Sequence, residues 1–157
     1  MALSHKEIQM KITLKKTYDF VGSFYENGLV AVHLNDKWGF VNEQGDEVVP
    51  LKYELVDSFY EGLSAVLLND KYGFVNEQGD EVIEAKYDYV GNFHEGFAKF
   101  RRNGKWGFLN YKGIEVVSPK YDYAWDFLGG KAQINLNKKY GYIDSQRNEY
   151  FDGESNA

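Results

Sequence analysis

The sequence predicts an all-β protein built as a tandem array of four repeats. A Lys-aromatic-Gly motif recurs with one period, since it begins at Lys37, Lys71, Lys105 and Lys139, each 34 residues after the one before. Among the 157 residues are 13 Tyr, 11 Phe and 3 Trp, and these residue types favour strands over helices. The apolar runs are short and are interrupted by glycine, which excludes helical repeats of similar period.

Further series of residues keep this period and set the repeat boundaries. They are Gly28, Gly62, Gly96 and Gly130; Tyr18, Tyr53, Tyr87 and Tyr121; and Phe24, Phe59, Phe93 and Phe127. The first interval of both aromatic series is 35, because Asn27 is an extra loop residue in the first repeat. We therefore expect one domain over 18–151, with repeats at about 18–50, 51–84, 85–118 and 119–151.

Each repeat is predicted to form a three-stranded antiparallel meander. In the third repeat, 97–102 is a strand, Asn103-Gly104 is a two-residue type I′ hairpin signal and 106–110 is the return strand. A third strand at 114–117 follows a short turn, and Pro119 is expected to end the ladder.

The first repeat reads in the same way, with strands at 29–34, 38–42 and 46–49. A fourth short strand near 53–58, and at the equivalent positions, is left open.

The alternation along the first strand of each meander predicts which face is buried. The core face holds Val30, Val32 and Leu34; Ser64, Val66 and Leu68; Ala98, Phe100 and Arg102; and Ala132, Ile134 and Leu136. The opposite face is apolar in the first repeats and polar in the last. Early repeats should therefore be covered on both sides, and later repeats should be exposed on one.

The N-terminal segment 1–17 is expected to supply a capping strand, because Met10, Ile12 and Leu14 alternate within 9–14. The fourth repeat has its own third strand near 149–151, so the leading strand is not needed to close a ring. An open, twisted stack is the preferred architecture, and a four-bladed propeller-like ring is the alternative. Residues 152–157 are expected to be a flexible tail.

These motifs resemble the WG-repeat family, also called KWG repeats. The shared signature runs aromatic–acidic–x, Phe-x-Glu-Gly, an apolar strand, Lys-Trp-Gly-Phe, a Gly-containing turn and Val-Val or Val-Ile, over about 18–151. Tyr72 and Tyr140 replace the Trp, and Gly129 replaces the Glu of the Phe-x-Glu-Gly motif. The resemblance implies a β-rich repeat architecture found mostly in bacterial proteins, and it implies no common enzymatic activity.

The ring–glycine pairs of the motif are expected to be scaffold residues, because a periodic fold must repeat its packing contacts. These pairs are Trp38 and Gly39, Tyr72 and Gly73, Trp106 and Gly107, and Tyr140 and Gly141. The alternative is that the rings form a platform on which a carbohydrate stacks.

Catalytic and metal sites are not expected. The chain has no cysteine, and His5, His33 and His94 share no ligand spacing. Hydrolase, P-loop and dinucleotide-binding motifs are missing from the sequence. The acidic turn that begins at Asn42 and recurs at Asn76 lacks the spacing of a calcium loop. We therefore predict a non-enzyme without cofactors.

The residues that break the period are the better candidates for binding a partner. The second repeat carries eight acidic and two basic residues, and the third carries six basic and three acidic residues. We expect an acidic ridge at Glu43, Asp46, Glu47, Glu77, Asp80 and Glu81. A basic patch is expected at Lys99, Arg101 and Arg102.

Trp125 occupies a slot that holds Gly or Asp in the other repeats, so it is either a terminal cap or a binding hot spot.

The leading hypothesis is a cytoplasmic, non-enzymatic module that binds another protein; a narrower version is an immunity protein or an inhibitor of a basic partner. The alternative is a carbohydrate-binding module, and a small-molecule ligand stays open. The net charge of −6 argues against a nucleic-acid partner. Membrane association is not expected, because there is no apolar stretch of roughly 20 residues. The cytoplasmic location is inferred from the absence of an N-terminal signal peptide.

Overall fold

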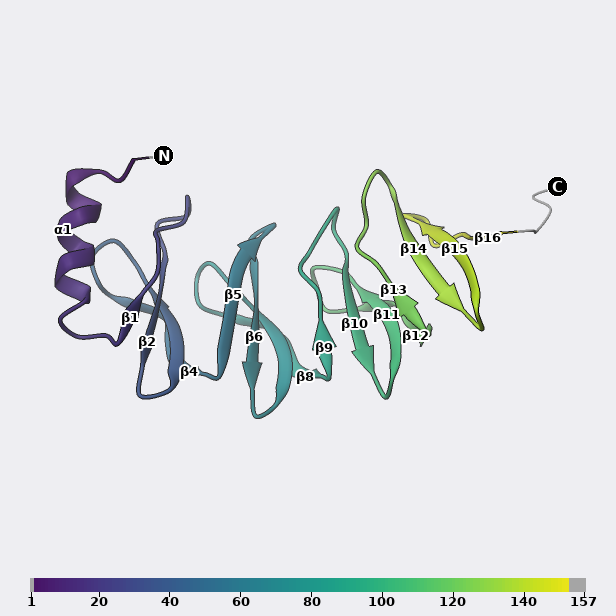
Figure 1. Cartoon of the computed structure of the whole chain (residues 1–157), viewed down its shortest axis with the longest axis horizontal. Coiled ribbons are helices and arrows are strands. Elements are labelled where there is room, and N and C mark those ends of the chain that lie inside the picture. Colours follow the sequence, from purple (N-terminus) through teal and green to yellow (C-terminus); the bar gives the residue numbers. More distant parts are fainter. Residues whose placement is uncertain (1, 153–157) are drawn as a thin grey trace.

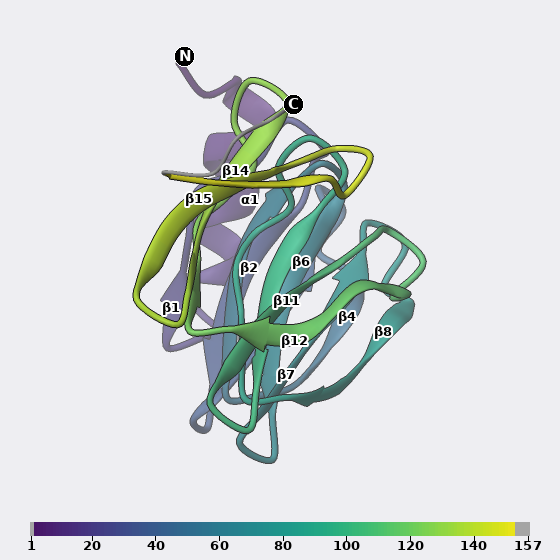
Figure 2. The ribbon, with the colours of Figure 1, turned by 90° about the vertical axis from the view of Figure 1, so that its right-hand side faces the viewer.

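The computed structural model describes residues 2–152 and shows four antiparallel sheets stacked in a row, with one helix at the N-terminal end (Figure 1). The two ends of the stack lie far apart, which confirms the open arrangement and excludes the propeller-like ring. Viewed from its C-terminal end, the stack has successive sheets rotated about its long axis, as the right-handed twist of strands requires (Figure 2).

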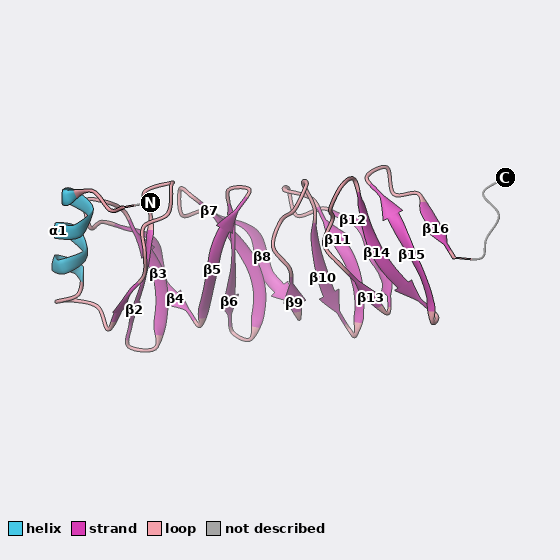
Figure 3. Ribbon diagram, turned by 45° about the horizontal axis from the view of Figure 1, so that its top comes forward, coloured by secondary structure: helices cyan, strands magenta, loops and turns pink. Residues whose placement is uncertain are grey.

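Each sheet is a four-stranded meander of consecutive strands (Figure 3). Sheet 1 contains β1 (Phe20–Val21), β2 (Val30–Leu34), β3 (Lys37–Val41) and β4 (Glu47–Tyr53). Sheet 2 contains β5 (Leu55–Tyr60), β6 (Leu63–Leu68), β7 (Lys71–Asn76) and β8 (Glu81–Tyr87). Sheet 3 contains β9 (Tyr89–Val90), β10 (Ala98–Arg102), β11 (Lys105–Leu109) and β12 (Glu115–Tyr121). Sheet 4 contains β13 (Tyr123–Ala124), β14 (Lys131–Leu136), β15 (Lys139–Asp144) and β16 (Glu149–Phe151).

The prediction of three strands per repeat was therefore one strand short. The additional strand is the first of each sheet, the short strand left open near 53–58. Three of these strands, β1, β9 and β13, contain only two residues each. A two-residue strand is too short for side-chain alternation to reveal it in the sequence.

The expectation that Pro119 ends the ladder was wrong, because β12 continues through it to Tyr121. Trp106 pairs with Tyr121 and Phe108 pairs with Val117, so residues 106–108 of β11 oppose a longer bulged stretch of β12, 117–121, that contains the proline. A proline is tolerated here because β12 is an edge strand and a bulged residue need not donate a ladder hydrogen bond. The repeats therefore meet at 54, 88 and 122, three residues beyond the predicted boundaries.

The N-terminal segment forms a helix, α1 (His5–Leu14), and the prediction of a capping strand was wrong. Ser4 caps the helix, since its Oγ accepts a hydrogen bond from the Glu7 N–H at 3.1 Å, and Ser-x-x-Glu is a helix-start signature. Met10 and Leu14 lie one turn apart on the face that packs against sheet 1. The segment therefore covers the end of the stack as a helix. Apart from Asp152, the predicted tail lies outside the described residues.

The stack is held together by apolar layers between successive units. Sheet 1 packs on α1, and further layers join sheets 1 and 2, sheets 2 and 3, and sheets 3 and 4. The predicted core face is confirmed: its first two residues in every repeat are buried, from Val30 and Val32 to Ala132 and Ile134. We call the opposite face of each sheet its outer face. It is buried by the next sheet at Leu29 and Leu63 and is exposed at the equivalent Lys131.

The motif glycines have a steric reason to recur. A β-carbon added to Gly73 would lie 2.4 Å from the carbonyl oxygen of Ile83, because the bulged strand β8 approaches it closely. The equivalent glycines also meet a carbonyl oxygen of the fourth strand of their own sheets at 2.1–2.4 Å: Gly39 at Val49, Gly107 at Val117 and Gly141 at Tyr150. The glycine therefore permits the close approach of two strands.

The acidic residue of the Phe-x-Glu-Gly motif joins one repeat to the next. The Glu61 carboxylate accepts hydrogen bonds from the N–H groups of Glu95 and Gly96 at 2.7 and 2.9 Å. Glu95 in turn accepts from the N–H groups of Gly129 and Gly130 at 2.7 and 2.8 Å. Each carboxylate thus satisfies two backbone donors in the turn of the following repeat.

Replacing Glu95 with alanine should lower the free energy of unfolding by about 1 kcal/mol. The N–H groups of Gly129 and Gly130 would lose their ionised acceptor and would form hydrogen bonds only with water. Hydrogen exchange of the Gly129 and Gly130 amides should accelerate while the amides of sheet 2 are unaffected. Glu26→Ala is the matched control at the equivalent slot of the first repeat, where no such bond is formed within 2–152. Equal amide protection in both variants would contradict the assignment.

A second acidic series supports the tight hairpins. Asp88 accepts a hydrogen bond from the Asn103 N–H at 2.9 Å and pairs with Lys71 of the preceding repeat at 2.5 Å. Asp122 likewise accepts a hydrogen bond from the Asn137 N–H at 2.7 Å and pairs with Lys105 at 2.5 Å. The pKa of each aspartate is lowered, first by the hydrogen bond from the lysine and second by the hydrogen bond from the backbone N–H.

Stability should therefore fall in acid. Because folding lowers these pKa values, the folded protein binds fewer protons than the unfolded chain. The contribution of the pairs is present above the ordinary aspartate pKa of about 3.9 and is lost as the pH falls through the lowered values. Urea unfolding at several pH values between 7 and 2 measures this, with Asp88→Asn/Asp122→Asn as the variant of weaker acid dependence. An unchanged dependence in that variant would exclude these two residues as the cause.

Candidate binding surfaces

Among the exposed large apolar side chains, one recurs at the same position of every repeat. These residues occupy equivalent positions at the start of the first strand of each sheet, and their exposed fractions lie between 36 and 54%. They are Phe20, Leu55, Tyr89 and Tyr123, and we call them the apolar strip. Exposed apolar residues that recur in register differ from singly scattered ones, because they form an extended surface.

The rings of the strip pack against the rings of the Lys-aromatic-Gly motif. Centroid distances are 5.5 Å from Tyr72 to Tyr89, 5.7 Å from Tyr89 to Trp106 and 5.1 Å from Trp106 to Tyr123. Trp125 extends the series, with its ring 4.5 Å from that of Tyr123. Such edge-to-face contacts hold the exposed rings in fixed orientations.

The motif rings themselves differ in exposure. Trp38 and Tyr72 are half-buried and Trp106 is buried, so these three support the strip from beneath. Tyr140 is 50% exposed, because nothing within 2–152 packs over the last sheet. Its position is that of a surface residue, whereas the other three have the packing expected of scaffold residues.

The expected basic patch is divided between two faces of sheet 3. The Lys99 ammonium lies 5.3 Å from the Trp106 ring centroid and 5.1 Å from that of Tyr123, beside the strip. Arg101 lies two residues further along the same face and is exposed. Arg102 points to the opposite face and pairs with Glu115, so including it in the patch was wrong. The reason is the alternation of side chains along β10.

The two turns that carry the acidic ridge lie next to each other, but several of the ridge side chains contact other residues of the protein. The second turn packs on the first repeat, since a β-carbon on Gly79 would lie 2.1 Å from the Val48 oxygen. Glu47 and Glu81 each accept a backbone N–H four residues ahead, at 3.1 and 3.4 Å.

The remaining ridge residues divide into two pairs. The half-buried Glu43 and Glu77 lie against Gly28 and Gly62. Asp46 and Asp80 are exposed to solvent.

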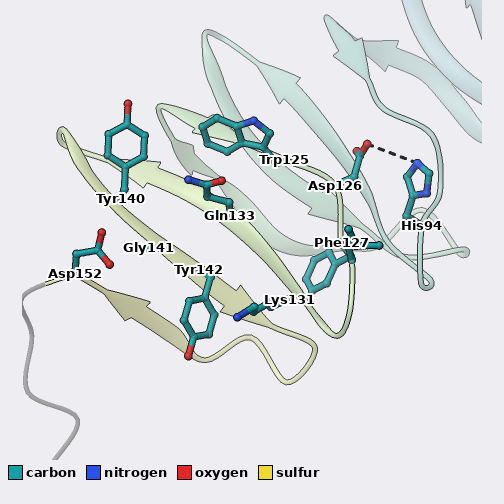
Figure 4. Close-up of a pocket in the computed structure, with 11 residues that line it drawn as sticks. His94, Trp125, Asp126, Phe127, Lys131, Gln133, Tyr140, Gly141, Tyr142 and Asp152 are labelled. Carbon is teal, nitrogen blue, oxygen red and sulfur yellow. Dashed lines mark ion pairs between the residues drawn. The ribbon is translucent and has the colours of Figure 1, made fainter.

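The outer face of sheet 4 carries a hollow of about 700 Å³ (Figure 4). Trp125, 37% exposed, lines it together with Tyr140, Tyr142 and Gln133. At its margin the His94 Nε2 lies 3.5 Å from Asp126 Oδ2, which joins the third and fourth repeats. Trp125 therefore belongs to a concave surface at the end of the stack.

Two further properties of residues 2–152 bear on function. No group of three or more His, Asp or Glu residues within this range could hold a metal ion. None of its helices is long and apolar enough to cross a membrane.

Sequence reasoning missed the apolar strip and the hollow. The strip residue is the unspecified third position of the aromatic–acidic–x motif, held by Phe, Leu, Tyr and Tyr. That apolar preference was a detectable signal. The hollow combines positions from β14, β15 and the loop after β13, and only the folded sheet brings them together.

Comparison with known proteins gives a family and a fold. The model of the WG containing repeat matches residues 8–38, 38–72, 72–106 and 106–140. No curated protein sequence matches the chain.

Three solved structures match the chain over part of their length. A structure described as KlHsv2 with loop 6CD replaced by a Gly-Ser linker has a TM-score of 0.51 and 10% identity, over 83% of this chain and 50% of that one. PorZ of Porphyromonas gingivalis has a TM-score of 0.46 and 7% identity, over 85% of this chain and 22% of that one. Virginiamycin B lyase from Staphylococcus aureus has a TM-score of 0.42 and 15% identity, over 83% and 53%. The chain thus spans about half or less of each of these structures, and the likeness to the first concerns fold alone.

Proposed function

The chain belongs to the family of WG-containing repeats, and from that premise we propose that it is a non-enzymatic module that binds a protein partner through the apolar strip. The observation that carries this proposal is the alignment of Phe20, Leu55, Tyr89 and Tyr123, one exposed apolar side chain per repeat. Exposed apolar surface of this extent is costly in a soluble domain unless a partner covers it.

The surroundings of the strip suit a protein interface. Its rings are held by neighbouring rings, so little side-chain entropy is lost when a partner covers them. Lys99 and Arg101 on one side, and the ion-paired Asp88 and Asp122, supply a polar rim around an apolar centre. Aromatic anchors inside a polar rim are typical of interface hot spots.

The narrower proposal, an immunity protein or inhibitor directed at a basic partner, depends on the acidic ridge. Asp46 and Asp80 are exposed, and so are Glu47 and Glu81, although these two also accept backbone hydrogen bonds. Glu43 and Glu77 are half-buried against the scaffold. Exposed charges of this kind favour long-range steering of a basic partner more than they favour affinity.

Photo-crosslinking tests the proposal. A crosslinking amino acid is introduced at Arg101, beside the strip, and the adducts formed in cells are identified. We expect one dominant protein adduct that is lost when Tyr89→Ser and Tyr123→Ser are added. Asp46→Asn/Asp80→Asn is the matched control and should keep the adduct. An adduct unaffected by the two serines, or the lack of any specific adduct, would overturn the proposal, provided that thermal melts show both variants folded.

A further inference from the structure

The outer face of sheet 4 differs in chemistry from the same face of the first two sheets, and sheet 3, with Phe97 and Lys99, is intermediate. In the first two repeats its slots hold Leu29 and Ala31, then Leu63 and Ala65, all under the next sheet. In the fourth repeat the same two slots hold Lys131 and Gln133, both exposed. An apolar sheet stacked here would bury the Lys131 ammonium and the Gln133 amide, which costs free energy unless both groups find partners.

A polar end cap explains Lys131 and Gln133, yet it does not explain the apolar groups beside them. Trp125 and Tyr140 are 37% and 50% exposed, and Leu128 is 81% exposed. The scaffold does not require the tryptophan, because its slot holds Gly22, Asp57 and Gly91 elsewhere. A face that only ends the stack gains nothing from these exposed side chains.

The register of sheet 4 places rings and polar groups in adjacent rows. The backbone N–H of Trp125 donates to the backbone carbonyl of Gln133, and Gln133 pairs with Tyr142 across the ladder, so these three residues form one row across the sheet. Tyr140 lies in the neighbouring row, paired with Asn135. Figure 4 shows Gln133 between the Trp125 and Tyr140 rings, with all three side chains on the side of the hollow.

From this geometry we infer that the hollow on the outer face of sheet 4 is a binding site for a neutral saccharide. Sugar rings combine an apolar C–H face with hydroxyl groups that both donate and accept. Trp125 and Tyr140 offer aromatic faces for the former. The Gln133 amide both donates and accepts, and the Asp152 carboxylate accepts. A volume of about 700 Å³ accommodates a short oligosaccharide.

The charges of the hollow favour a neutral ligand. Asp126 and Asp152 contribute carboxylates and Lys131 an ammonium group, so neither sign dominates. Lys131 already lies 4.6 Å from the Tyr142 ring centroid, and Asp126 is held near His94. A strongly charged ligand would find no field of the opposite sign here.

Isothermal titration of the protein with maltohexaose, cellohexaose, mannohexaose and chitohexaose tests the inference. We expect saturable binding of at least one of these oligosaccharides. Trp125→Ala and Tyr140→Ala should each weaken it roughly tenfold or more, as for truncated hot-spot residues. Tyr89→Ser, in the apolar strip, is the matched control and should bind with unchanged affinity, which separates this site from the proposed protein-binding surface.

Thermal melts of each variant keep the result interpretable. Gln133→Ala, an exposed substitution, should also weaken binding without changing the melting temperature. The inference is overturned if no oligosaccharide binds saturably, if the Trp125→Ala protein binds as tightly as wild type, or if only the apolar-strip variant loses binding.

Discussion

Replacing Gly73 with alanine is expected to lower the free energy of unfolding by about 3 kcal/mol or more. The added β-carbon would lie 2.4 Å from the Ile83 oxygen and 2.7 Å from the Ala85 nitrogen. Both atoms belong to the backbone of the bulged strand β8, so no side-chain rotation relieves the clash. The bulge must move, and with it the end of β8 that carries the buried Tyr87. Urea unfolding followed by circular dichroism measures the loss.

Gly104→Ala is the matched control. Gly104 has a φ of +79°, and a β-carbon added there meets no atom within 4 Å. Its replacement should cost only the strain of a left-handed backbone, about 1 kcal/mol. If the two variants are equally destabilised, backbone conformation and not the close approach of two strands explains the glycine of the motif.

The sequence predicted those parts of the fold that the period itself encodes. The hairpin at Asn103-Gly104 is an example, because both residues have positive φ, as a type I′ turn requires. The bulge around Pro119 was missed because proline normally ends a ladder, and only the edge position of β12 makes it tolerable. The helix α1 was missed because Met10 and Leu14 fit both an alternating and a helical pattern, whereas Ile12, which fits only the alternating one, is exposed. The Ser4 to Glu7 cap was the signal that distinguished them.

The candidate surfaces were less predictable than the fold, for a physical reason. Whether a ring is buried depends on whether the next sheet covers it. An aromatic residue at the same position of the repeat can therefore be buried in one repeat and exposed in another. Trp106 and Tyr140 occupy one slot, yet the former is 7% exposed and the latter 50%. Trp125 was identified from its departure from the period, and the structure places it in the terminal hollow. Glu81 was identified from local charge, and its hydrogen bond to a backbone N–H depends on folded geometry.

Replacing Phe74 with alanine should destabilise the protein by about 3–5 kcal/mol, since a fully buried aromatic ring is removed and a cavity is left behind. The Phe74 ring lies between sheets 2 and 3 and contacts that of Phe93 at a centroid distance of 4.9 Å. In a linear array each repeat contacts only its neighbours, so a damaged layer also weakens the coupling between the two halves. Hydrogen exchange should therefore show sheets 1 and 2 opening independently of sheets 3 and 4.

Tyr142→Ala provides the comparison, because Tyr142 occupies the same slot in the last repeat. Its ring is half-buried and faces the terminal hollow, with no further sheet above it within 2–152. Its removal should cost about 1 kcal/mol or less and should leave the unfolding of the four sheets coupled. The difference between the two variants measures what covering one face of a repeat contributes to stability. If both variants lose a similar free energy of unfolding, stability resides within the individual sheets. The apolar layers between sheets would then not explain the cooperative unfolding of the stack.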